Sequence, residues 1–283
     1  MHVARPLLLP EKSAFHYMWR CINGEFFMKT NPIKAMFLNS FFKFMKRARG
    51  QVLLYSFCVM SNHFHMAAEL LKDSVYMSWW ARSGKSSFAQ KLNKILGRRG
   101  PVGQDRPKTV VVEDKESLMR LMFYHDWNPV AANICKHPAD YPYSSYRFYA
   151  FGEKNKWTSK ITPPQWYEDL ADTAEERQRL YQVLCEEYWV NKKKATDDEA
   201  EEDKKNTDEG YGIGSEKFVG NRTRLMRAIG RVLKHKQTSG RMLMSIEELK
   251  RLAMRLVVPG GCAASPVANP GRPVRKPPSE PAG

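Results

Sequence analysis

The sequence has 283 residues, 42% hydrophobic and 12% aromatic, which suffices for one or two folded domains and excludes a wholly disordered chain. Its 46 Lys and Arg against 30 Asp and Glu give a net charge of +16. No run of about 18 apolar residues is present, so we expect no transmembrane helix, and the first ten residues lack the pattern of a secretory signal. The five cysteines form no CxxC pair, which argues against a disulfide framework and favours a cytoplasmic protein.

The positive charge is unevenly distributed. Residues 1–150 carry a net +12, residues 151–210 a net −6 and residues 211–283 a net +10. Basic segments rich in aromatic residues favour nucleic-acid binding, because phosphates attract Lys and Arg and unstacked bases pack on aromatic rings. The alternative is a basic, solvated surface without a nucleic-acid partner.

Hydrophobic periodicity in residues 1–150 alternates between the period of strands and that of helices. In chain order it predicts a strand at 14–22, a helix at 31–49, a hairpin of strands at 51–59 and 63–70, a helix at 75–96, a strand at 108–113 and a helix at 114–127. Asn31-Pro32 and Asp114 are helix-start signals. This order predicts an α+β fold in which helices pack on an antiparallel sheet.

The rest of the chain changes character after residue 152. We expect a helical extension at 153–190, a charged linker at 191–214, a basic helical region at 215–257, and a disordered tail rich in Pro and Gly at 258–283.

Two histidines make the first candidate site. In His63-Phe64-His65, alternation along a strand places both imidazoles on one face and Phe64 in the core. Two imidazoles on one face form half of a site for a divalent metal. The alternative is two histidines on the polar face of a strand. His16, on the first predicted strand, is assigned to the core.

Tyr124 and Asn128 make the second candidate site. Residues four apart share a face of a helix, so the phenol and the amide would lie side by side. Pro129 disfavours helical backbone at Asn128, so we expect the helix to end there, with His125 and Asp126 as exposed, helix-terminal residues. A metal on the histidines would neutralise a phosphodiester while the tyrosine attacks its phosphorus to form a phosphotyrosine. Taken alone, Tyr124 is better explained as an amphipathic residue at a helix–sheet boundary than as a catalytic residue.

Three ordered motifs resemble a known family. Val59–Met66 (VMSNHFHM) resembles the hydrophobic-Met-Pro-Asn-His-hydrophobic-His segment of the single-tyrosine HUH transposases. Tyr124–Val130 (YHDWNPV) resembles their Tyr-x-x-x-Asn-Pro-Val helix, and Asp140–Tyr146 (DYPYSSY) resembles the Asp-Tyr-Pro-Trp-Ser-Ser-Tyr that follows it. The combination is similar to the REP-associated tyrosine transposases, over about residues 12–152. The resemblance implies a ferredoxin- or RRM-like antiparallel sheet and a catalytic domain at 1–152.

The resemblance also implies roles for individual residues. His63 and His65 would hold Mg²⁺ or Mn²⁺, with Asn128 as a third ligand, and Tyr124 would be the nucleophile that takes a 5′-phosphotyrosine link and leaves a free 3′-hydroxyl. The substrate would be single-stranded DNA beside an imperfect hairpin in a repetitive extragenic palindrome, and the protein would act as a monomer or homodimer.

The motifs depart from the family at three places without losing a catalytic group. Ser61 replaces the usual proline, Ala131-Ala132 stands where Arg-Ala is common, and Tyr143 replaces tryptophan. We expect the Ala131 change to weaken a DNA contact.

Basic side chains outside the motifs are candidate phosphate contacts, although ordinary solvation explains them equally well. They are Lys85, Arg98, Arg99, Arg106 and Arg147. The segment around Lys85, Ser83-Gly84-Lys85, is not a P-loop, because Trp79 stands where that motif requires glycine. Two other functions stay open: a domesticated protein that binds hairpin DNA without cleaving it, and a metal-dependent hydrolase that uses water while Tyr124 is structural.

Overall fold

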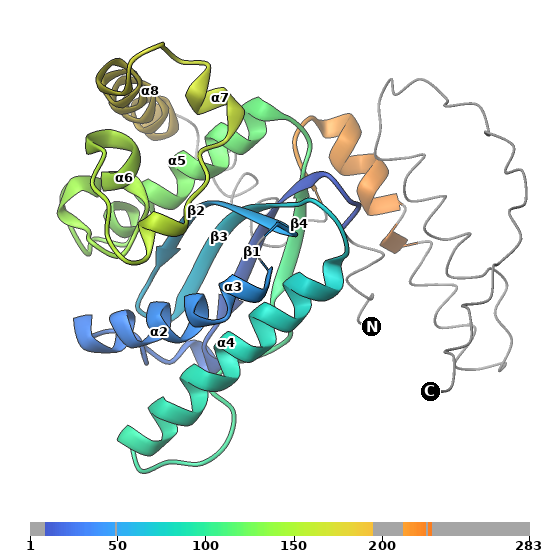
Figure 1. Ribbon diagram of the computed structural model, residues 1–283, viewed down its shortest axis with the longest axis vertical. Coiled ribbons are helices and arrows are strands. Elements are labelled where there is room, and N and C mark those ends of the chain that lie inside the picture. The colour runs from blue at the N-terminus through green and yellow to red at the C-terminus, as the bar shows by residue number, and fades with distance from the viewer. Residues whose placement is uncertain (1–8, 49, 195–211, 225, 228–283) are drawn as a thin grey trace, which may run out of the picture.

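The structure is a computed structural model in which a mixed sheet carries helices on both faces (Figure 1). It describes residues 9–48, 50–194, 212–224 and 226–227. The predicted disordered tail and most of the predicted linker and basic helical region lie outside these residues. None of the described helices is both long and apolar enough to cross a membrane.

Within the described residues, five strands form one sheet in the order β2-β3-β1-β4-β5. They are β1 (Ser13–Arg20), β2 (Val52–Val59), β3 (His63–Leu70), β4 (Lys108–Val112) and β5 (Gly212–Ile213). The strands β1 to β4 pair with one another in antiparallel orientation, and β5 runs parallel to β4. The predicted α+β class and the ferredoxin-like arrangement are confirmed, because β1–β4 follow the β-α-β-β-α-β order with both predicted crossover helices.

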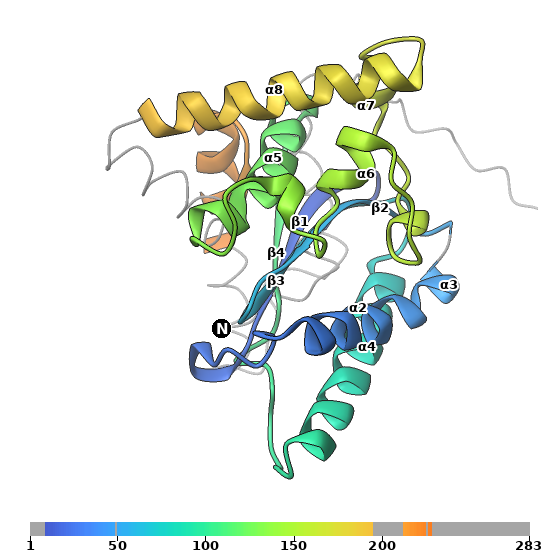
Figure 2. The same cartoon turned by 90° about the vertical axis from the view of Figure 1, so that its left-hand side faces the viewer.

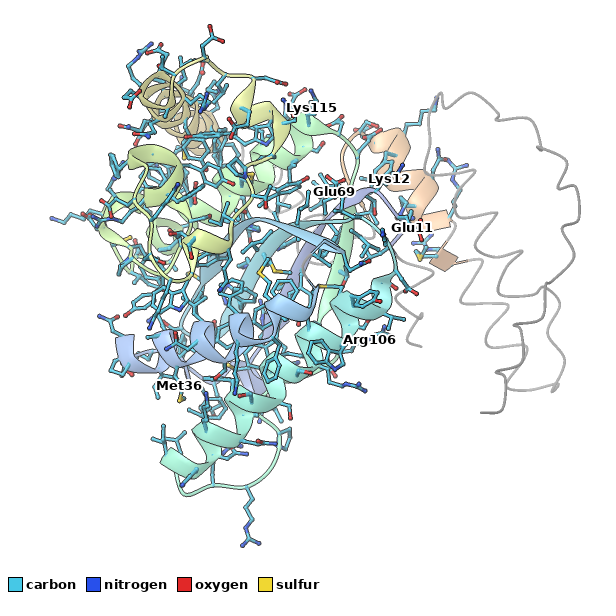
Figure 3. All side chains as sticks on the ribbon, viewed as in Figure 1. Glu11, Lys12, Met36, Glu69, Arg106 and Lys115 are labelled. Carbon is cyan, nitrogen blue, oxygen red and sulfur yellow. The ribbon has the colours of Figure 1, made fainter. Side chains whose placement is uncertain are left out.

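One face of the sheet is covered by the two crossover helices. These are α2 (Asn31–Lys43), continued by the short α3 (Met45–Ala48), and α4 (Ser74–Ile95). Alternate strand residues face them, and the contact is aromatic: the Trp19 ring stacks on Phe37 at 5.4 Å and meets Phe88 edge-on at 6.1 Å. Phe64 lies 4.9 Å from both Phe37 and Phe41. Figure 3 shows side chains between the sheet and these two helices, and the five aromatic residues named above are all buried.

The opposite face is covered by α5 (Lys115–Ala131), which the Asp114 side chain caps as predicted by accepting a hydrogen bond from the Ser117 amide at 2.8 Å. Figure 2 shows α5 on the far side of the sheet from α2 and α4, with α8 (Ala174–Lys194) lying across it. Between them the chain forms α6 (Tyr146–Phe151), α7 (Gln165–Glu168) and the short 3-10 turns η2 (Pro138–Asp140) and η3 (Thr158–Lys160); a further turn, η1 (Ile22–Gly24), follows β1.

The segment after residue 152 differs from its predicted boundaries. Its first part is not helical but lies along the free edge of β2, where Ile161 bridges Leu54 and the Thr162 amide donates to the Leu54 carbonyl at 2.9 Å. The helix α8 continues to Lys194, into the predicted linker, and the end of that linker forms β5. Residues 216–224 are helical, as predicted for the start of the basic region.

Gly84 has a packing role that explains the glycine in Ser83-Gly84-Lys85. It lies in α4 where that helix crosses α2, and a Cβ atom there would lie 2.8 Å from the Phe41 Cα and 3.2 Å from its carbonyl oxygen. Both neighbours are backbone atoms, which cannot rotate away. Glycine is therefore required for the close approach of two helices, not for a phosphate loop.

We predict that Gly84→Ala destabilises the fold by about 1–2 kcal/mol, because the overpacking cost exceeds the gain in helix propensity. The measurement is urea unfolding followed by circular dichroism. Ser86→Ala, at an exposed position of the same helix, is the control and should leave the free energy of unfolding unchanged or slightly higher. Equal stability of the two variants would contradict the close contact.

Candidate active site

His63 and His65 begin β3 and face α5. His63 pairs across the sheet with Arg20 and His65 with Met18. The two imidazoles lie 4.7 Å apart between ring centroids, while Phe64 between them points into the aromatic layer on the other face. His65 is fully buried and His63 is half-buried. The strand therefore presents one shielded and one accessible imidazole on the same face, as the alternation predicts.

Tyr124 and Asn128 lie on the edge of α5 that meets these histidines. The Tyr124 ring meets the His65 ring edge-on at 5.5 Å, and the Asn128 amide Nδ2 lies 3.2 Å from His65 Nε2. The oxygen and nitrogen of an amide side chain exchange places by a half-turn, so the same position can present Oδ1. The structure thus brings together the four residues His63, His65, Tyr124 and Asn128 that the sequence singles out.

The prediction that the helix ends at Asn128 is wrong. The helix α5 includes Pro129 and runs to Ala131, and the Asn128 carbonyl accepts from the Ala132 amide at 3.0 Å. The steric cost of helical backbone at the residue before proline is outweighed here by burial of the Pro129 ring and by the hydrogen bonds of the last turn. The full last turn keeps Asn128 helical and on the same face as Tyr124.

A cluster of buried histidines lies behind this site. His16 Nε2 is 2.9 Å from His65 Nδ1, and His125 Nδ1 is 2.9 Å from the Ser56 hydroxyl. One ring nitrogen from each of His16, His65 and His125 lies within 4.8 Å of the other two, so the three could hold a metal ion. His16 is in the core, as predicted, but it also touches the site. His125 was predicted to be exposed and is fully buried, which corrects that prediction.

Burial favours the uncharged form of the His65 and His125 imidazoles. It lowers the pKa of His65 well below its usual value, and the neighbouring His63, His16, His125 and Arg20 lower it further. Burial and the nearby His16 likewise lower the pKa of His125. Neutral imidazoles keep a lone pair for a metal at neutral pH, so the donors match the chemistry of a divalent cation.

The side chains offer two donor sets that share His65. His63, His65 and Asn128 combine two imidazoles with an amide oxygen, a set that accepts Mg²⁺ or Mn²⁺ when water and phosphate complete the shell. His16, His65 and His125 are three imidazoles, which suit zinc and the later transition metals. His125 Nε2 is buried without a hydrogen-bond partner, as a group that lacks its ligand would be.

Comparisons with known proteins give one partial likeness. A solved structure of a REP-associated tyrosine transposase bound to a REP hairpin aligns with a TM-score of 0.43 at 18% identity, over 55% of this chain and 91% of that one. Its family is the one that the three sequence motifs resemble. No family model matches the sequence, and no curated protein matches it either.

Three of the predicted phosphate contacts lie in the loop between α4 and β4. The Val102 carbonyl accepts from the Ile22 amide at 2.9 Å and the Gln104 amide donates to the Arg20 carbonyl at 3.0 Å, so this loop lies at the end of the sheet where β3 begins with His63. Arg98 stacks over Phe27 at 4.7 Å, and Arg99 and Arg106 are exposed. The loop lies at the sheet end that presents the accessible histidine.

The other two predicted contacts differ in setting. Lys85 lies in α4, on the face of the sheet opposite Tyr124. Arg147 is bound to Glu153 through hydrogen bonds of 2.8 and 2.6 Å, and it also donates to the Ala139 carbonyl at 3.2 Å. Its guanidinium stabilises the loop after α6, so a DNA contact there would compete with these bonds.

Asp126 was predicted to be exposed, but it is fully buried between α5 and α8. Its Oδ2 accepts a hydrogen bond from the Tyr181 hydroxyl at 2.5 Å, while Oδ1 has no partner. Burial raises the pKa of Asp126 from 3.8 to about 8, and the Tyr181 hydrogen bond opposes that rise. No local pattern around Asp126 predicts this burial, because the covering helix α8 begins 48 residues later.

We predict that Asp126 makes stability depend on pH. A carboxyl whose pKa is raised in the folded state binds its proton more tightly there, so its stabilising effect is full below about pH 4 and is lost as the pH rises through about 8. The free energy of unfolding of the wild type should therefore fall relative to that of Asp126→Asn by about 1 kcal/mol or more between pH 5 and pH 9. Urea unfolding across this range measures the difference, and parallel curves for the two proteins would contradict it.

Proposed function

We propose that this protein is a single-tyrosine HUH transposase, a metal-dependent endonuclease and strand transferase acting on single-stranded DNA next to a hairpin. The observation that carries the proposal is that Tyr124 and Asn128, one helical turn apart on α5, both lie against His65, the buried member of the histidine pair. A nucleophile beside a ready metal-donor set is the arrangement that phosphodiester transesterification requires.

In the proposed reaction, the Tyr124 hydroxyl oxygen attacks a DNA phosphorus. The phenolic proton leaves for water, the bond from phosphorus to the 3′-oxygen breaks, and that oxygen takes a proton to become a free 3′-hydroxyl. The strand downstream of the break stays joined to Tyr124 through its 5′-phosphate, as a phosphotyrosine. Because one ester replaces another, a second 3′-hydroxyl can reverse the step and join a new strand.

The protein's own residues hold the nucleophile and the donors in place. The helix α5 fixes the Tyr124 ring against His65, and His16 holds the His65 ring through a hydrogen bond of 2.9 Å to Nδ1. That bond leaves His65 Nε2 facing Asn128. Because packing and hydrogen bonds restrict the rotamers of these side chains, the geometry needed for the reaction is kept.

We assign the catalytic metal to His63, His65 and Asn128, since His63 and Asn128 are half-buried and a DNA phosphate can reach them, whereas the cluster of His16, His65 and His125 is fully enclosed. A divalent cation bound there would neutralise the phosphate and favour attack on phosphorus. Mg²⁺ and Mn²⁺ fit this donor set.

We predict that manganese binding separates the two donor sets. His63→Ala should weaken Mn²⁺ binding by about tenfold or more, as loss of a ligand does, and His65→Ala should abolish it. His125→Gln, which changes only the enclosed set, should leave it close to wild type. Titration calorimetry or electron paramagnetic resonance of bound Mn²⁺ measures the affinities. Weak binding by His125→Gln together with normal binding by His63→Ala would place the metal on the enclosed histidines.

We predict that the protein forms a covalent adduct with DNA through Tyr124. Labelled single-stranded hairpin oligonucleotides from the protein's own genomic flanks, incubated with Mg²⁺ or Mn²⁺, should give a band on a denaturing gel that resists denaturant. Tyr124→Phe should abolish the band because it removes the attacking oxygen, and His63→Ala should strongly reduce it. Tyr143→Phe is the matched control and should form the adduct normally.

The same gel separates the rival functions. Cleavage that survives Tyr124→Phe would indicate hydrolysis by metal-bound water. Tight hairpin binding without adduct or cleavage, with either metal, would indicate a domesticated protein that binds but does not cut.

A further inference from the structure

The end of α8 brings a lysine to the proposed nucleophile. Lys192 Nζ lies 5.0 Å from the centroid of the Tyr124 ring and 3.4 Å from the Tyr188 hydroxyl. Both Tyr124 and Lys192 are half-buried, so the pair borders solvent. Lys192 comes from outside residues 12–152, the segment that carries all three transposase-like motifs. The motifs therefore assign it no role.

The position of Lys192 is set by aromatic packing of α8 on α5. The Trp189 and Trp127 rings stack in parallel at 4.6 Å, and the Trp127 indole donates to the Cys185 carbonyl at 2.8 Å. Phe123 packs against Tyr188 at 5.8 Å. These contacts lie on both sides of Tyr124 along α5. They fix both the rotation and the register of α8, so Lys192 cannot slide away from Tyr124 without breaking them.

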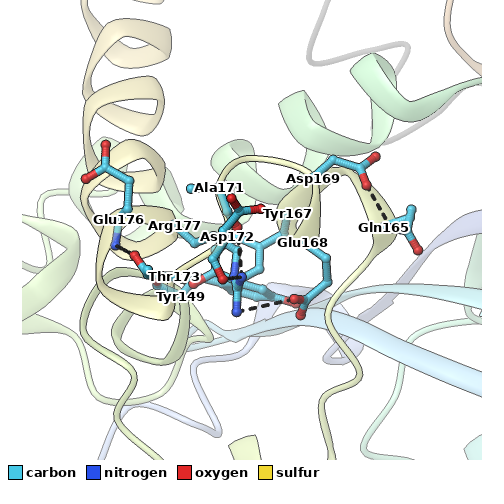
Figure 4. Close-up of polar contacts among 10 residues, drawn as sticks. All are labelled: Tyr149, Gln165, Tyr167, Glu168, Asp169, Ala171, Asp172, Thr173, Glu176 and Arg177. Carbon is cyan, nitrogen blue, oxygen red and sulfur yellow. Dashed lines mark hydrogen bonds and ion pairs between the residues drawn. The ribbon is translucent and has the colours of Figure 1, made fainter.

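The start of α8 is fixed as well. Arg177 donates to the carbonyls of Ala171 and Asp172 at 2.8 and 3.1 Å and pairs with Glu168 at 3.4 Å (Figure 4). In Figure 2, α8 crosses above α5. A helix held at its start and along its length presents its last turn reproducibly.

We propose that Lys192 is a catalytic residue whose ammonium binds the DNA phosphate attacked by Tyr124. This proposal rests on the proposed function. A phosphate placed for attack touches the tyrosine hydroxyl, so its non-bridging oxygens come within the reach of a lysine that lies over the same ring. A lysine stem is flexible and its three N–H donors rotate freely, so Nζ can move from the ring to the oxygens. The charge then stays paired with the phosphotyrosine after the strand is cut.

A purely structural role for Lys192 is the alternative, because it lies in the last turn of α8. Cations in the last turn of a helix stabilise its carbonyl end, and this turn holds Lys192, Lys193 and Lys194. Lys193, however, lies over Trp189 at 5.2 Å and not over Tyr124. Lys193→Met therefore removes the same charge from the same turn without touching the nucleophile, which makes it the matched control.

The first measurement is the rate of adduct formation by the full-length protein with saturating hairpin DNA. Lys192→Met should slow it by about tenfold to a hundredfold, the loss expected for a hydrogen bond to a charged group. Lys192→Arg should restore most of the rate, and Lys193→Met should keep it. Melting temperatures of the variants check that α8 still packs. Equal rates for Lys192→Met and Lys193→Met would overturn the proposal.

The second measurement needs no cleavage. In the Tyr124→Phe background, the slope of log affinity against log salt for single-stranded DNA should fall by about 0.7 with Lys192→Met, the loss of one phosphate contact. Lys193→Met should leave the slope unchanged. A lower slope, together with failure of the wild-type protein to form an adduct, would refute the proposed transposase chemistry and keep the phosphate contact. A slower rate with an unchanged slope would overturn the phosphate contact and keep the chemistry.

Discussion

The candidate site depends on the burial of α5 between the sheet and α8. His125 faces the sheet and bonds to Ser56, while Asp126, the next residue, faces α8 and bonds to Tyr181. Because these two side chains are held by different partners, the sheet and α8, the helix cannot rotate about its axis without breaking one of the contacts. The remaining edge, with Tyr124 and Asn128, must then meet the histidine of β3. The proposed nucleophile and the proposed metal donors are thus brought together by the contacts of two other residues, His125 and Asp126.

This arrangement buries polar groups, and their chemistry follows from that burial. Desolvation favours the neutral form of every ionisable group, so it lowers the pKa of His65 and His125 and raises that of Asp126. A neutral histidine can bind a metal or form a hydrogen bond with another neutral histidine. Burying a neutral aspartic acid costs far less free energy than burying a carboxylate. The groups that fix α5 therefore also keep excess charge out of the space behind the metal donors.

The sequence predicts the parts of this architecture that depend on local pattern. Alternation placed His63 and His65 on one face with Phe64 opposite, and the four-residue spacing placed Tyr124 above Asn128. The burial of His125 and Asp126 could not be predicted in this way, because α8 and the strand partners that enclose them are distant in the chain. The same holds for β5, since two residues at the end of the predicted charged linker carry no strand pattern of their own. At Pro129, a sound local rule failed because the steric restriction on the preceding residue, Asn128, is outweighed by packing of the last helical turn.

Segment charge is a poor guide to where a phosphate can bind. Residues 151–210 carry a net −6, which by itself argues against a role in holding DNA. Within α8, however, the charges are separated along the axis: Glu175 and Glu176 lie in the first turn and three lysines in the last. Glu176 is already paired with Arg179 at 2.6 Å, far along the helix from Lys192. Because charges in water act over only about 10 Å at moderate salt, the acidic start has little effect at Tyr124, whereas the basic end lies directly over its ring. An extension that is acidic on average thus places a cation beside the proposed nucleophile.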